Sequence, residues 1–432
     1  FVMENVSMLR SDVHRFYLDE ADNKLFDQEK YEIHMQSTKL VLLDKAYMFD
    51  CAKTIARSSS AITANIRPED CYVSLNVVYK MSKNHQKLLK TLKKHKKKLL
   101  EYADIYADEG EKHDIESNDI ALRSYEAFSA IKQFFDEKLE ADKLKDVIEP
   151  AIMIQRMLSK SKEIFDNHLV VDKCDYAENG DLVAYIKSYA VFDYLKALLG
   201  TDSNGYEINQ DVLCAADFGA PQKRKRFIVI GIKKSLTDTV QLPIGIFSEK
   251  DYRTVQDAIG DLQNVPTVTD VAEDIGTPLN KADDISELGN SLRDTDTLFI
   301  HIITKTRVTA MERFKSIKQC ENFHSLNDSL KTNTYTDANR TQNTISLRLA
   351  YNQPSGTVVN VRKSMWIHPE LNRAISIREA ARLQTFPDSF IFCGSKDKQY
   401  QQVGNAVPPI MAKAIAEKLA DQLEQIEKRF ER

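Results

Sequence analysis

The feature that most constrains the fold is an apolar run at residues 227–232, which reads FIVIGI. An unbroken apolar run predicts a strand covered on both faces, because a strand with one exposed face alternates apolar and polar residues. Two strand-like runs, Tyr206–Cys214 and Arg226–Lys233, are separated by the loop AADFGAPQKRK, and the apolar run lies within the second of them. A helix is predicted over Tyr189–Leu199, directly before this pair. These residues therefore predict a buried sheet with a helix leading into it.

The composition is that of an ordinary globular protein and points to no particular partner. The 432 residues are enough for two or three domains, and the formal net charge is −4. The six cysteines form no Cys-x-x-Cys pair, so we expect reduced thiols of a cytoplasmic protein, with neither zinc ligands nor disulfides. The sequence has no apolar stretch long enough for a transmembrane helix and no secretory signal. Because it begins with Phe1, we expect a fragment or a processed product.

The chain divides into zones of different character. Residues 1–9 form an apolar, β-branched run that predicts a buried strand. Residues 10–185 contain few prolines or glycines and show helical spacing, which predicts a helical block. Residues 236–345 are polar with weak periodicity, which is typical of a loop-rich segment or a small irregular domain. After Pro354 the expected elements are a strand-like VVNV run, a helix over Ser376–Phe386 and a long helix over Pro408–Arg432.

Two stretches of the helical block carry opposite charge. The stretch Lys80–Tyr102 has nine lysines between Lys80 and Lys98 and no acid among them. The stretch Ile120–Lys145 is acidic and aromatic. Both have apolar residues at helical spacing, so we expect two long helices that form a hairpin or a small bundle.

Five short motifs along the chain together carry a family resemblance. They are ENV at 4–6, GYEINQDVLCAADFGAPQKRKRFIVIG at 205–231, TVQDAIGDL at 254–262, IHPELNRAISIREAARLQTFPDSF at 367–390 and QVGNAVPP at 402–409. Each alone is a weak signal. Together and in this order they resemble the later motifs of the DNA cytosine-5 methyltransferases. The resemblance covers roughly half of the chain, leaves out residues 10–185 and is thin over 236–345.

The resemblance implies an α/β fold in which the chain supplies the last strands of a partial Rossmann-like methyltransferase sheet. It also implies a small target-recognition domain and a large helical insertion. The expected domains are 1–9 (catalytic-domain strand with ENV), 10–185 (helical insertion), 186–259 (catalytic-domain strands with Gln-x-Arg-x-Arg), 260–377 (target-recognition domain) and 378–432 (recognition-domain helix and a C-terminal helix returning to the catalytic domain).

The chemistry of the family explains why these residue types recur. A cysteine thiolate attacks C6 of a cytosine flipped out of duplex DNA, and C5 then takes a methyl group from S-adenosylmethionine. By resemblance Glu4 assists at the Watson–Crick edge of the base as charge develops there. Arg226 contacts the flipped base, and Arg224 lies close by, toward the DNA backbone. Without the other motifs, Glu4 is better read as a loop cap and the arginines as a basic strand end.

The resemblance also implies contacts with the cofactor. Asn405, Ala406 and Val407 form the turn that closes over the methionine end of S-adenosylmethionine. Gly404 before them permits a close backbone approach. The alternative for Asn405 is a helix N-cap, with a proline inside the first turn.

The expected DNA contacts come from three places. Gln222 and Lys223 precede the two arginines of the Gln-x-Arg-x-Arg motif. Arg378 and Arg382 lie on a helix that in the family organises the target-recognition domain, so we expect structural work from them first and DNA contact second.

Within the lysine-rich stretch, the expected DNA contacts are Lys94 and Lys97. Lysines that neutralise phosphates add salt-dependent affinity. The alternative is a solvated helix face. A run of nine lysines without an acid is unusual for solubility alone, so both interpretations stay open.

Two loops that carry the family's chemistry are absent from the 432 residues. Neither a glycine-rich D-x-F-x-G-x-G-G loop nor a Pro-Cys-Gln loop occurs, and none of the cysteines follows a proline. The first four strands of the family's sheet have no counterpart either. We therefore expect one part of a split or truncated restriction–modification enzyme, inactive alone. It would need a missing N-terminal segment or a partner chain that carries both loops.

Two other classes of function stay open. One is a non-catalytic DNA-binding or regulatory relative, and the other is a helical scaffold with a vestigial domain. Retention of Glu4, Arg224, Arg226 and Asn405 favours the enzyme, since a binding module has no need of base and cofactor contacts. The expected location is the cytoplasm for a bacterial or phage protein and the nucleus for a eukaryotic one.

Overall fold

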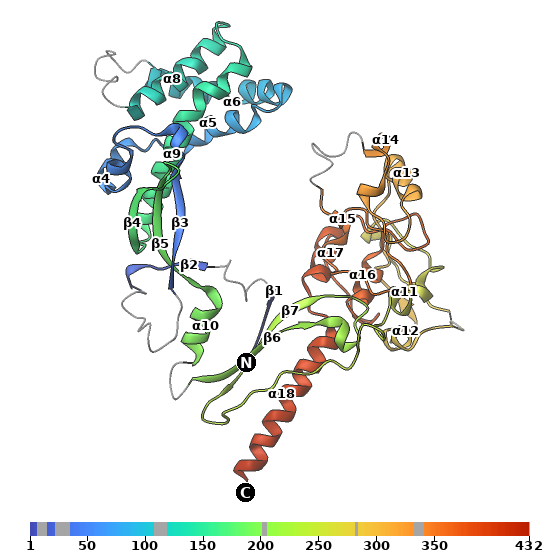
Figure 1. Cartoon of the computed structure of the whole chain (residues 1–432). Helices are drawn as coiled ribbons and strands as arrows, with labels where there is room; N and C mark the ends of the chain where they lie inside the picture. Colours follow the sequence, from blue (N-terminus) through green and yellow to red (C-terminus); the bar gives the residue numbers. More distant parts are fainter. Residues whose placement is uncertain are drawn as a thin grey trace. The chain divides into compact units, whose positions relative to one another are not determined.

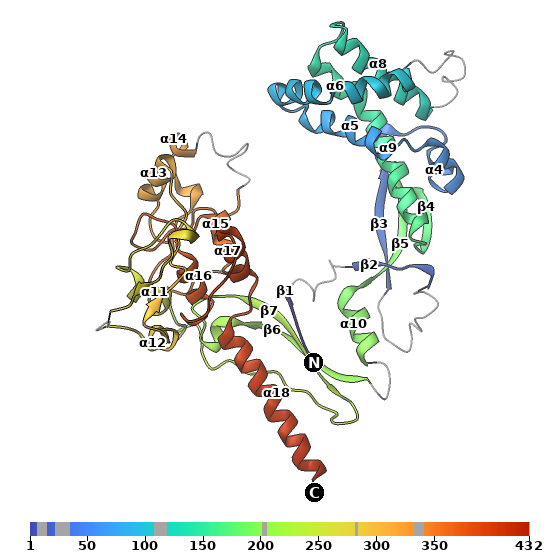
Figure 2. The ribbon, with the colours of Figure 1, turned by 180° about the vertical axis from the view of Figure 1, so that it is seen from behind.

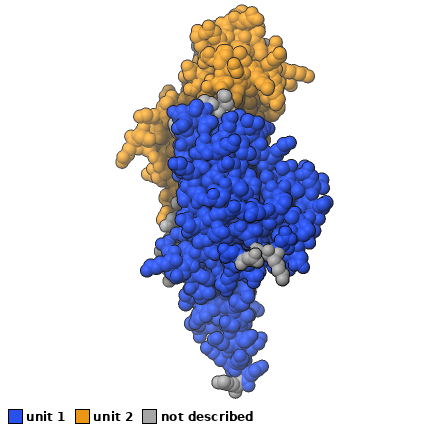
Figure 3. Space-filling model, turned by 90° about the vertical axis from the view of Figure 1, so that its right-hand side faces the viewer, with its two compact units in different colours: residues 1–11, 198–432 blue, residues 12–197 orange. Residues whose placement is uncertain are grey.

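The computed structural model describes residues 1–6, 15–21, 35–107, 119–200, 205–280, 284–331 and 341–431. The chain folds into two compact units: unit 1 contains Phe1–Ser11 and Leu198–Arg432, and unit 2 contains Asp12–Ala197. Figures 1 and 2 show the ribbon from two sides, and Figure 3 colours unit 1 blue and unit 2 orange. Unit 2 covers the zone expected to be an insertion and continues to Ala197. The fold is of the mixed α/β class, as expected.

The sheet of unit 1 has three strands in the order β1-β7-β6. Both β1 (Val2–Val6) and β6 (Tyr206–Cys214) pair antiparallel with β7 (Lys225–Lys233), so β7 is the central strand. Every residue of β7 from Phe227 to Ile232 is buried, which confirms the strand predicted from the apolar run. The strand at the start of the chain is less buried than predicted: Phe1 and Val2 are 37% and 45% exposed, because β1 is an edge strand of this sheet.

The long helix α18 (Pro409–Phe430) packs against one face of this sheet and confirms the predicted terminal helix. Met411 and Ile415 of α18 share an apolar cluster with Ile228 and Ile230 of β7. Farther along the helix, the Gln422 side chain accepts a hydrogen bond from the backbone N–H of Gln241 and donates one to its carbonyl, at 2.7 and 3.0 Å. In Figure 1 α18 is the red helix that ends at the C-terminus. The helix α18 therefore covers the sheet face around Ile228.

The rest of unit 1 consists of short helices and irregular chain around α16 (Ile377–Leu383), all of whose residues are buried. The predicted helix over Ser376–Phe386 is confirmed in its central part, with Ser376 as the N-cap. The VVNV run is not a strand, because Asn360 caps a short helix there. The surrounding elements are α11 (Val255–Ile259), α12 (Glu287–Leu292), α13 (Val308–Ser316), α14 (Asp328–Lys331), α15 (Val361–Ser364), α17 (Lys396–Asn405), β8 (Thr277–Pro278), β9 (Thr297–Leu298) and the 3-10 turns η4 (Ala215–Phe218), η5 (Gly260–Leu262), η6 (Val271–Glu273) and η7 (Phe323–Ser325).

Unit 2 contains an antiparallel sheet, where the sequence predicted helices throughout. Its long strand β5 (Leu182–Ala190) pairs with β2 (Arg15–Tyr17), β3 (Met35–Leu43) and β4 (Val171–Tyr176). The missed signal is the Asn179-Gly180 pair between β4 and β5, since Asn-Gly favours the tight turn of a hairpin. Gly180 has the positive φ of 88° that such a turn requires.

The helices of unit 2 form two apolar clusters that meet along α9 (Leu144–Asp166). Its first half packs with α6 and α8 through Ile148 and Ile152, and its second half packs on the sheet through Met157 and Leu158. The other helices are α3 (Ala52–Ala56), α4 (Ser59–Asn65), α5 (Glu69–Met81), α6 (His85–Ala107), α8 (Asp119–Phe135) and α10 (Val191–Gly200), with the 3-10 turns η2 (Lys45–Tyr47) and η3 (Ala141–Lys143). The last three residues of α10 belong to unit 1.

The boundaries of the two charged helices differ from the predicted ones. The stretch Lys80–Tyr102 is divided between α5 and α6, because Asn84 caps the start of α6 by accepting a hydrogen bond from the backbone N–H of Lys87. The acidic helix α8 ends at Phe135, and α9 begins at Leu144. No helix among the residues that the structure describes is both long and apolar enough to cross a membrane.

Two neighbouring leucines of α6 test the core of unit 2. Leu88 is fully buried and Leu89 is 41% exposed. We expect Leu88→Ala to lower the free energy of unfolding by about 2–5 kcal/mol, because it removes buried methyl groups and leaves a cavity. Leu89→Ala, the matched control, should change it by less than about 1 kcal/mol. Urea unfolding of both variants measures the difference, and equal losses would contradict the assigned face of α6.

Candidate functional site

Glu4 and Arg226 form an ion pair on the sheet of unit 1. The distance from Glu4 Oε1 to Arg226 Nε is 2.6 Å. The antiparallel register places Glu4 opposite Ile228, two residues along β7 from Arg226, so the three side chains lie on one face of the sheet. The side chains of Glu4 and Arg226 are 30% and 12% exposed. The structure therefore brings together the carboxyl and guanidinium groups that the two motifs predicted.

Partial burial alters the protonation of this pair. Burial raises the pKa of Glu4, and the charge and hydrogen bond of Arg226 only partly offset that rise. Burial also lowers the pKa of Arg226, against the opposite influence of Glu4. For both groups desolvation outweighs the pairing. The Glu4 carboxyl therefore holds a proton to higher pH than an exposed glutamate does, which suits a group that exchanges a proton with a ligand.

Arg224 is a buried structural residue, which differs from the expected site role. Its side chain is fully buried. The guanidinium group donates hydrogen bonds to the carbonyl oxygens of Val358 and Gly404, at 2.7 and 3.0 Å. Both acceptors belong to unit 1's own backbone, so Arg224 ties the start of β7 to the end of α17.

Gln222, which was expected to contact DNA, is buried in the same junction. Its amide donates to the carbonyl oxygen of Leu383 and to Gln384 Oε1, at 2.9 and 2.7 Å. Its own oxygen accepts from the backbone N–H of Val358 at 3.0 Å. All hydrogen-bonding groups of this amide are thus turned inward, toward α16 and the segment before α15.

Close packing around position 404 explains why a glycine stands before Asn405. A Cβ atom built on Gly404 would lie 2.6 Å from the carbonyl carbon of Val359 and 2.8 Å from the backbone nitrogen of Asn360. These contacts are with backbone atoms, which cannot move aside as a flexible side chain can. The close approach that the glycine permits is therefore to the protein's own chain, whereas the sequence suggested an approach to the cofactor.

Asn405 ends α17, and residues 406–408 link it to α18. The N-cap position of α18 is Pro408, so the alternative of an Asn405 N-cap is wrong. Asn405 is exposed, and its Oδ1 accepts a hydrogen bond from Gln401 at 2.7 Å. Within the described residues its amide nitrogen has no hydrogen-bond partner. Val407 packs against the cluster that contains Ile228, so this linker lies against the same cluster as the Glu4–Arg226 sheet face.

Arg378 and Arg382 of α16, which were expected to contact DNA, are both fully buried. Arg382 pairs with Asp388 at 2.6 Å and with Asp261 at 2.5 Å. Arg378 donates to the backbone carbonyls of Phe299, Pro387 and Phe390, and burial lowers its pKa to about 10. The structural role that we expected first is the one they have.

A buried charge cluster at the start of α16 escaped the sequence reasoning. Glu379 is fully buried and pairs with Arg373 at 2.6 Å, and His368 Nε2 lies 3.8 Å from the same carboxylate. Burial lowers the pKa of His368 to about 4. The available signal was the Ser-x-x-Glu pattern at 376–379, which forms a complete capping box here.

The remaining predicted contacts are exposed lysines. Lys223 pairs with Glu249 at 2.9 Å and lies 5.5 Å from the centre of the Tyr252 ring. Lys94 and Lys97 are exposed on α6 of unit 2. These three residues keep their ammonium groups in solvent, so they are available to an anion.

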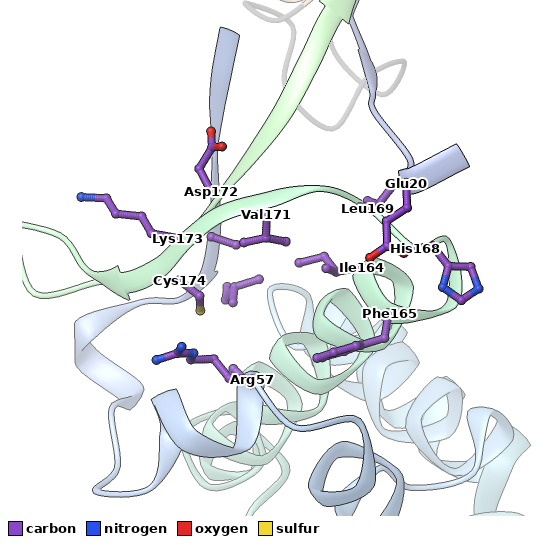
Figure 4. A pocket seen from close by; sticks show the side chains of 13 residues that line it. Glu20, Arg57, Ile164, Phe165, His168, Leu169, Val171, Asp172, Lys173 and Cys174 are labelled. Atoms are coloured by element: carbon purple, nitrogen blue, oxygen red, sulfur yellow. The ribbon is translucent and has the colours of Figure 1, made fainter. Parts of the chain in front are cut away.

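Unit 2 also contains a cavity of about 390 Å³ that holds no predicted site residue (Figure 4). Apolar side chains such as Ile164 and Leu169 form much of its wall, and Arg57 and Cys174 lie on one side. Burial raises the pKa of the Cys174 thiol, which keeps it protonated and unreactive. The cavity therefore offers no activated nucleophile.

Comparisons with known proteins follow the motif pattern. The model of the family described as C-5 cytosine-specific DNA methylase matches residues 178–421. The type II methyltransferase M.DdeI of Desulfomicrobium norvegicum is 30% identical over 251 residues, covering 54% of this chain and 59% of the relative. M1.HphI of Haemophilus parahaemolyticus is 34% identical over 213 residues, covering 49% and 48%. M.XorII of Xanthomonas oryzae is 31% identical over 246 residues, covering 51% and 53%. The chain thus spans about half the length of these relatives.

The junction at Gly404 can be tested with a matched pair of glycines. We expect Gly404→Ala to destabilise the protein by about 1–3 kcal/mol, because the new Cβ meets backbone atoms that must shift. Gly356→Ala is the control, since a Cβ there has no atom within 4 Å. Its effect should stay within about 0.5 kcal/mol. Chemical denaturation measures both, and a Gly404→Ala variant as stable as the control would contradict the close approach.

Glu379 predicts a loss of stability in acid. Burial acts to raise its pKa, but the hydrogen bond and charge of Arg373 outweigh burial and lower it from 4.5 to about 2. A lowered pKa means that the carboxylate stabilises the fold above about pH 4.5, and that this contribution disappears as the pH falls toward 2. Urea unfolding at several pH values in this window should show a smaller pH dependence for Glu379→Gln than for the native chain. Glu424→Gln, which changes an exposed residue paired with Lys428, should keep the native pH dependence. Identical profiles for all three proteins would refute the assignment.

Proposed function

Because this chain belongs to the C-5 cytosine-specific DNA methylase family, we propose that it holds the target base in a type II DNA methyltransferase. The reaction transfers a methyl group from S-adenosylmethionine to C5 of a cytosine flipped out of duplex DNA. In this proposal the β1-β7-β6 sheet represents the last strands of the family's sheet, and the short helices around α16 represent the target-recognition part.

The Glu4–Arg226 pair is the observation that supports this function. A carboxyl group can donate a proton to N3 of cytosine and accept a hydrogen bond from its amine, and a guanidinium group can donate to O2. These atoms lie on one edge of a single ring, and the two side chains lie on one face of a single sheet. The raised pKa of Glu4 favours a protonated carboxyl, which is the form that supports positive charge on the base.

The residues after α17 fit the amino-acid end of S-adenosylmethionine. The amide nitrogen of Asn405 is exposed and can donate to a carboxylate, while Ala406 and Val407 provide the chain beside it. Bound there, S-adenosylmethionine supplies the methyl group. Gly404 supports this turn indirectly, since it packs against the backbone at Val359 and so fixes the position of Asn405.

The attacking cysteine and the glycine-rich loop come, in this proposal, from outside these 432 residues. None of the six cysteines follows a proline. Cys214 is the one on the sheet of unit 1, where it pairs in register with Lys225 at the end of β6. Burial raises the pKa of its thiol, which disfavours the reactive thiolate.

Methyl transfer assays test the function directly. We expect the chain with labelled S-adenosylmethionine and duplex DNA to transfer no methyl group. Addition of a polypeptide that carries the glycine-rich and Pro-Cys-Gln loops should restore transfer to cytosine C5. Transfer by the chain alone would contradict the proposal that a second polypeptide supplies part of the active site. If no such mixture transferred a methyl group, the proposed enzymatic function would be refuted.

Lys223, three residues before Arg226, keeps its expected role as a DNA contact in this proposal. Its ammonium group is exposed and pairs with the exposed Glu249. Such a pair contributes little to stability, so a phosphate can replace the carboxylate without loss to the fold.

Substitution of Glu4 separates chemistry from folding. In the restored mixture, Glu4→Gln should lower the rate of methyl transfer by about 10²–10⁴-fold, because the amide has no proton to exchange with the base. DNA binding should remain within about threefold, since phosphates supply most of the affinity. Glu417→Gln, an exposed change on α18, is the control and should keep the native rate. If the Glu4→Gln variant had the same rate as the control, Glu4 would have no part in the reaction.

A further inference from the structure

The lysines of α6 fall into two groups with different surroundings. Lys98 pairs with Asp70 at 2.9 Å, and Lys96 lies 5.2 Å from the centre of the Phe135 ring. Five others have exposed side chains that make no ion pair or hydrogen bond within the described part of the chain. They are Lys87 in the first turn of α6 and four residues of the following turns, which we call the lysine face: Lys90, Lys93, Lys94 and Lys97. The first group stabilises unit 2, whereas the side chains of the lysine face make no such contact there.

Helix geometry places the lysine face opposite the core of unit 2. Leu88, Leu92 and Leu99 are buried at intervals of four and seven residues and form the inward stripe of α6. Lys90 lies two residues after Leu88, and Lys97 lies two residues before Leu99. Two residues correspond to a rotation of about 200° around the helix. Lys93 and Lys94 lie between these two lysines on the same outward side. The lysine face extends about 10 Å along the helix axis.

The four ammonium groups repel one another. They occupy positions i, i+3, i+4 and i+7, and like charges at these spacings destabilise a helix. The next acid along α6 is Glu101, one turn beyond Lys97. The described residues of unit 2 therefore leave this charge without compensation, which suits the surface to an external polyanion.

We propose that the lysine face binds the phosphate backbone of duplex DNA, independently of base sequence. This inference rests on the proposed function, which makes DNA the substrate of unit 1. One DNA strand carries a charge about every 3.4 Å, so 10 Å of helix spans roughly three phosphates. Lysine ammonium groups act as point charges, which suit phosphates better than base edges.

A membrane surface fits the lysine face less well. Binding of an amphipathic helix in a membrane surface requires an apolar face directed at the lipid. The apolar stripe of α6 is occupied in the core of unit 2. Duplex DNA needs only the charges that the lysine face presents.

The test compares two variants of the full chain with equal changes in charge. One replaces the lysine face: Lys90→Gln, Lys93→Gln, Lys94→Gln and Lys97→Gln. The control replaces four lysines of unit 2 that pair with acids of the same unit: Lys138→Gln, Lys143→Gln, Lys145→Gln and Lys162→Gln. Fluorescence anisotropy measures the affinity for a labelled duplex from about 50 to about 200 mM salt.

The loss of about three phosphate contacts should reduce the slope of log K against log salt by roughly 2.7 in the lysine-face variant. Its affinity at about 100 mM salt should fall roughly 10²-fold, and that of the control by less than about threefold. Equal losses in both variants would show an effect of total charge and overturn the proposal. Unchanged binding by the lysine-face variant, or no binding by the native chain, would overturn it as well. Selective loss of binding to phosphatidylserine vesicles, with DNA binding retained, would assign the face to a membrane.

Folding and function are separated by two further measurements. The lysine-face variant should melt no lower than the native chain, because mutual repulsion is removed. If it does not fold, the double variants Lys90→Gln with Lys94→Gln, and Lys93→Gln with Lys97→Gln, should each remove about half of the slope change. DNA binding is measured without cofactor or the additional polypeptide. An absence of methyl transfer in every mixture with the additional polypeptide, together with normal lysine-dependent binding, would therefore refute the proposed function and leave this inference standing.

Discussion

The hydrogen bonds from Arg224 to the carbonyls of Val358 and Gly404 are the interaction on which the candidate site depends. They join the start of β7, the chain before α15 and the end of α17. Arg226 follows two residues later on β7, and Asn405 follows Gly404 directly, so one buried guanidinium fixes the starting points of both proposed binding groups. A buried charge is expensive unless its hydrogen bonds are satisfied. Here each of the two terminal nitrogens donates to one backbone carbonyl, and Nε has no hydrogen-bond partner among the described residues.

The charges of α16 follow the same logic. Arg382 and Asp388 are fully buried and pair with each other, and Arg382 also pairs with Asp261, so these buried charges compensate one another. Glu379 serves both as a helix cap and as the partner of Arg373. This helix therefore acts as a rigid centre for the irregular chain around it, which has few regular elements of its own. Arginines in a DNA-modifying family are readily assigned to phosphate contacts, but the buried arginines of this helix stabilise the fold.

The sequence predicted the elements with strong local patterns. The apolar run of β7, the terminal helix α18 and the capped helix α16 all lie where their periodicity and caps place them. The sheet of unit 2 was missed because few glycines and frequent helix formers suggested helices throughout. Local propensity is a weak guide to strands, whose stability comes from pairing with distant residues. The Asn179-Gly180 turn was the local sign of β4 and β5, and Asn84 was the sign that α5 and α6 are separate helices.

The amino-acid sequence by itself determined the family and singled out Glu4, Arg226 and the turn at Asn405, because motif order and residue type carry that information. The ion pair between Glu4 and Arg226 came from the structure. Only the tertiary structure decided which of the polar motif residues face outward. Gln222, Arg224, Arg378 and Arg382 have the same side-chain chemistry whether they meet a phosphate or a backbone carbonyl. Their partners come from segments more than a hundred residues away for Gln222 and Arg224, and spacing along the chain does not encode such contacts. Burial, which depends on the whole packed unit, separates the partly exposed Arg226 from the fully buried Arg224, Arg378 and Arg382.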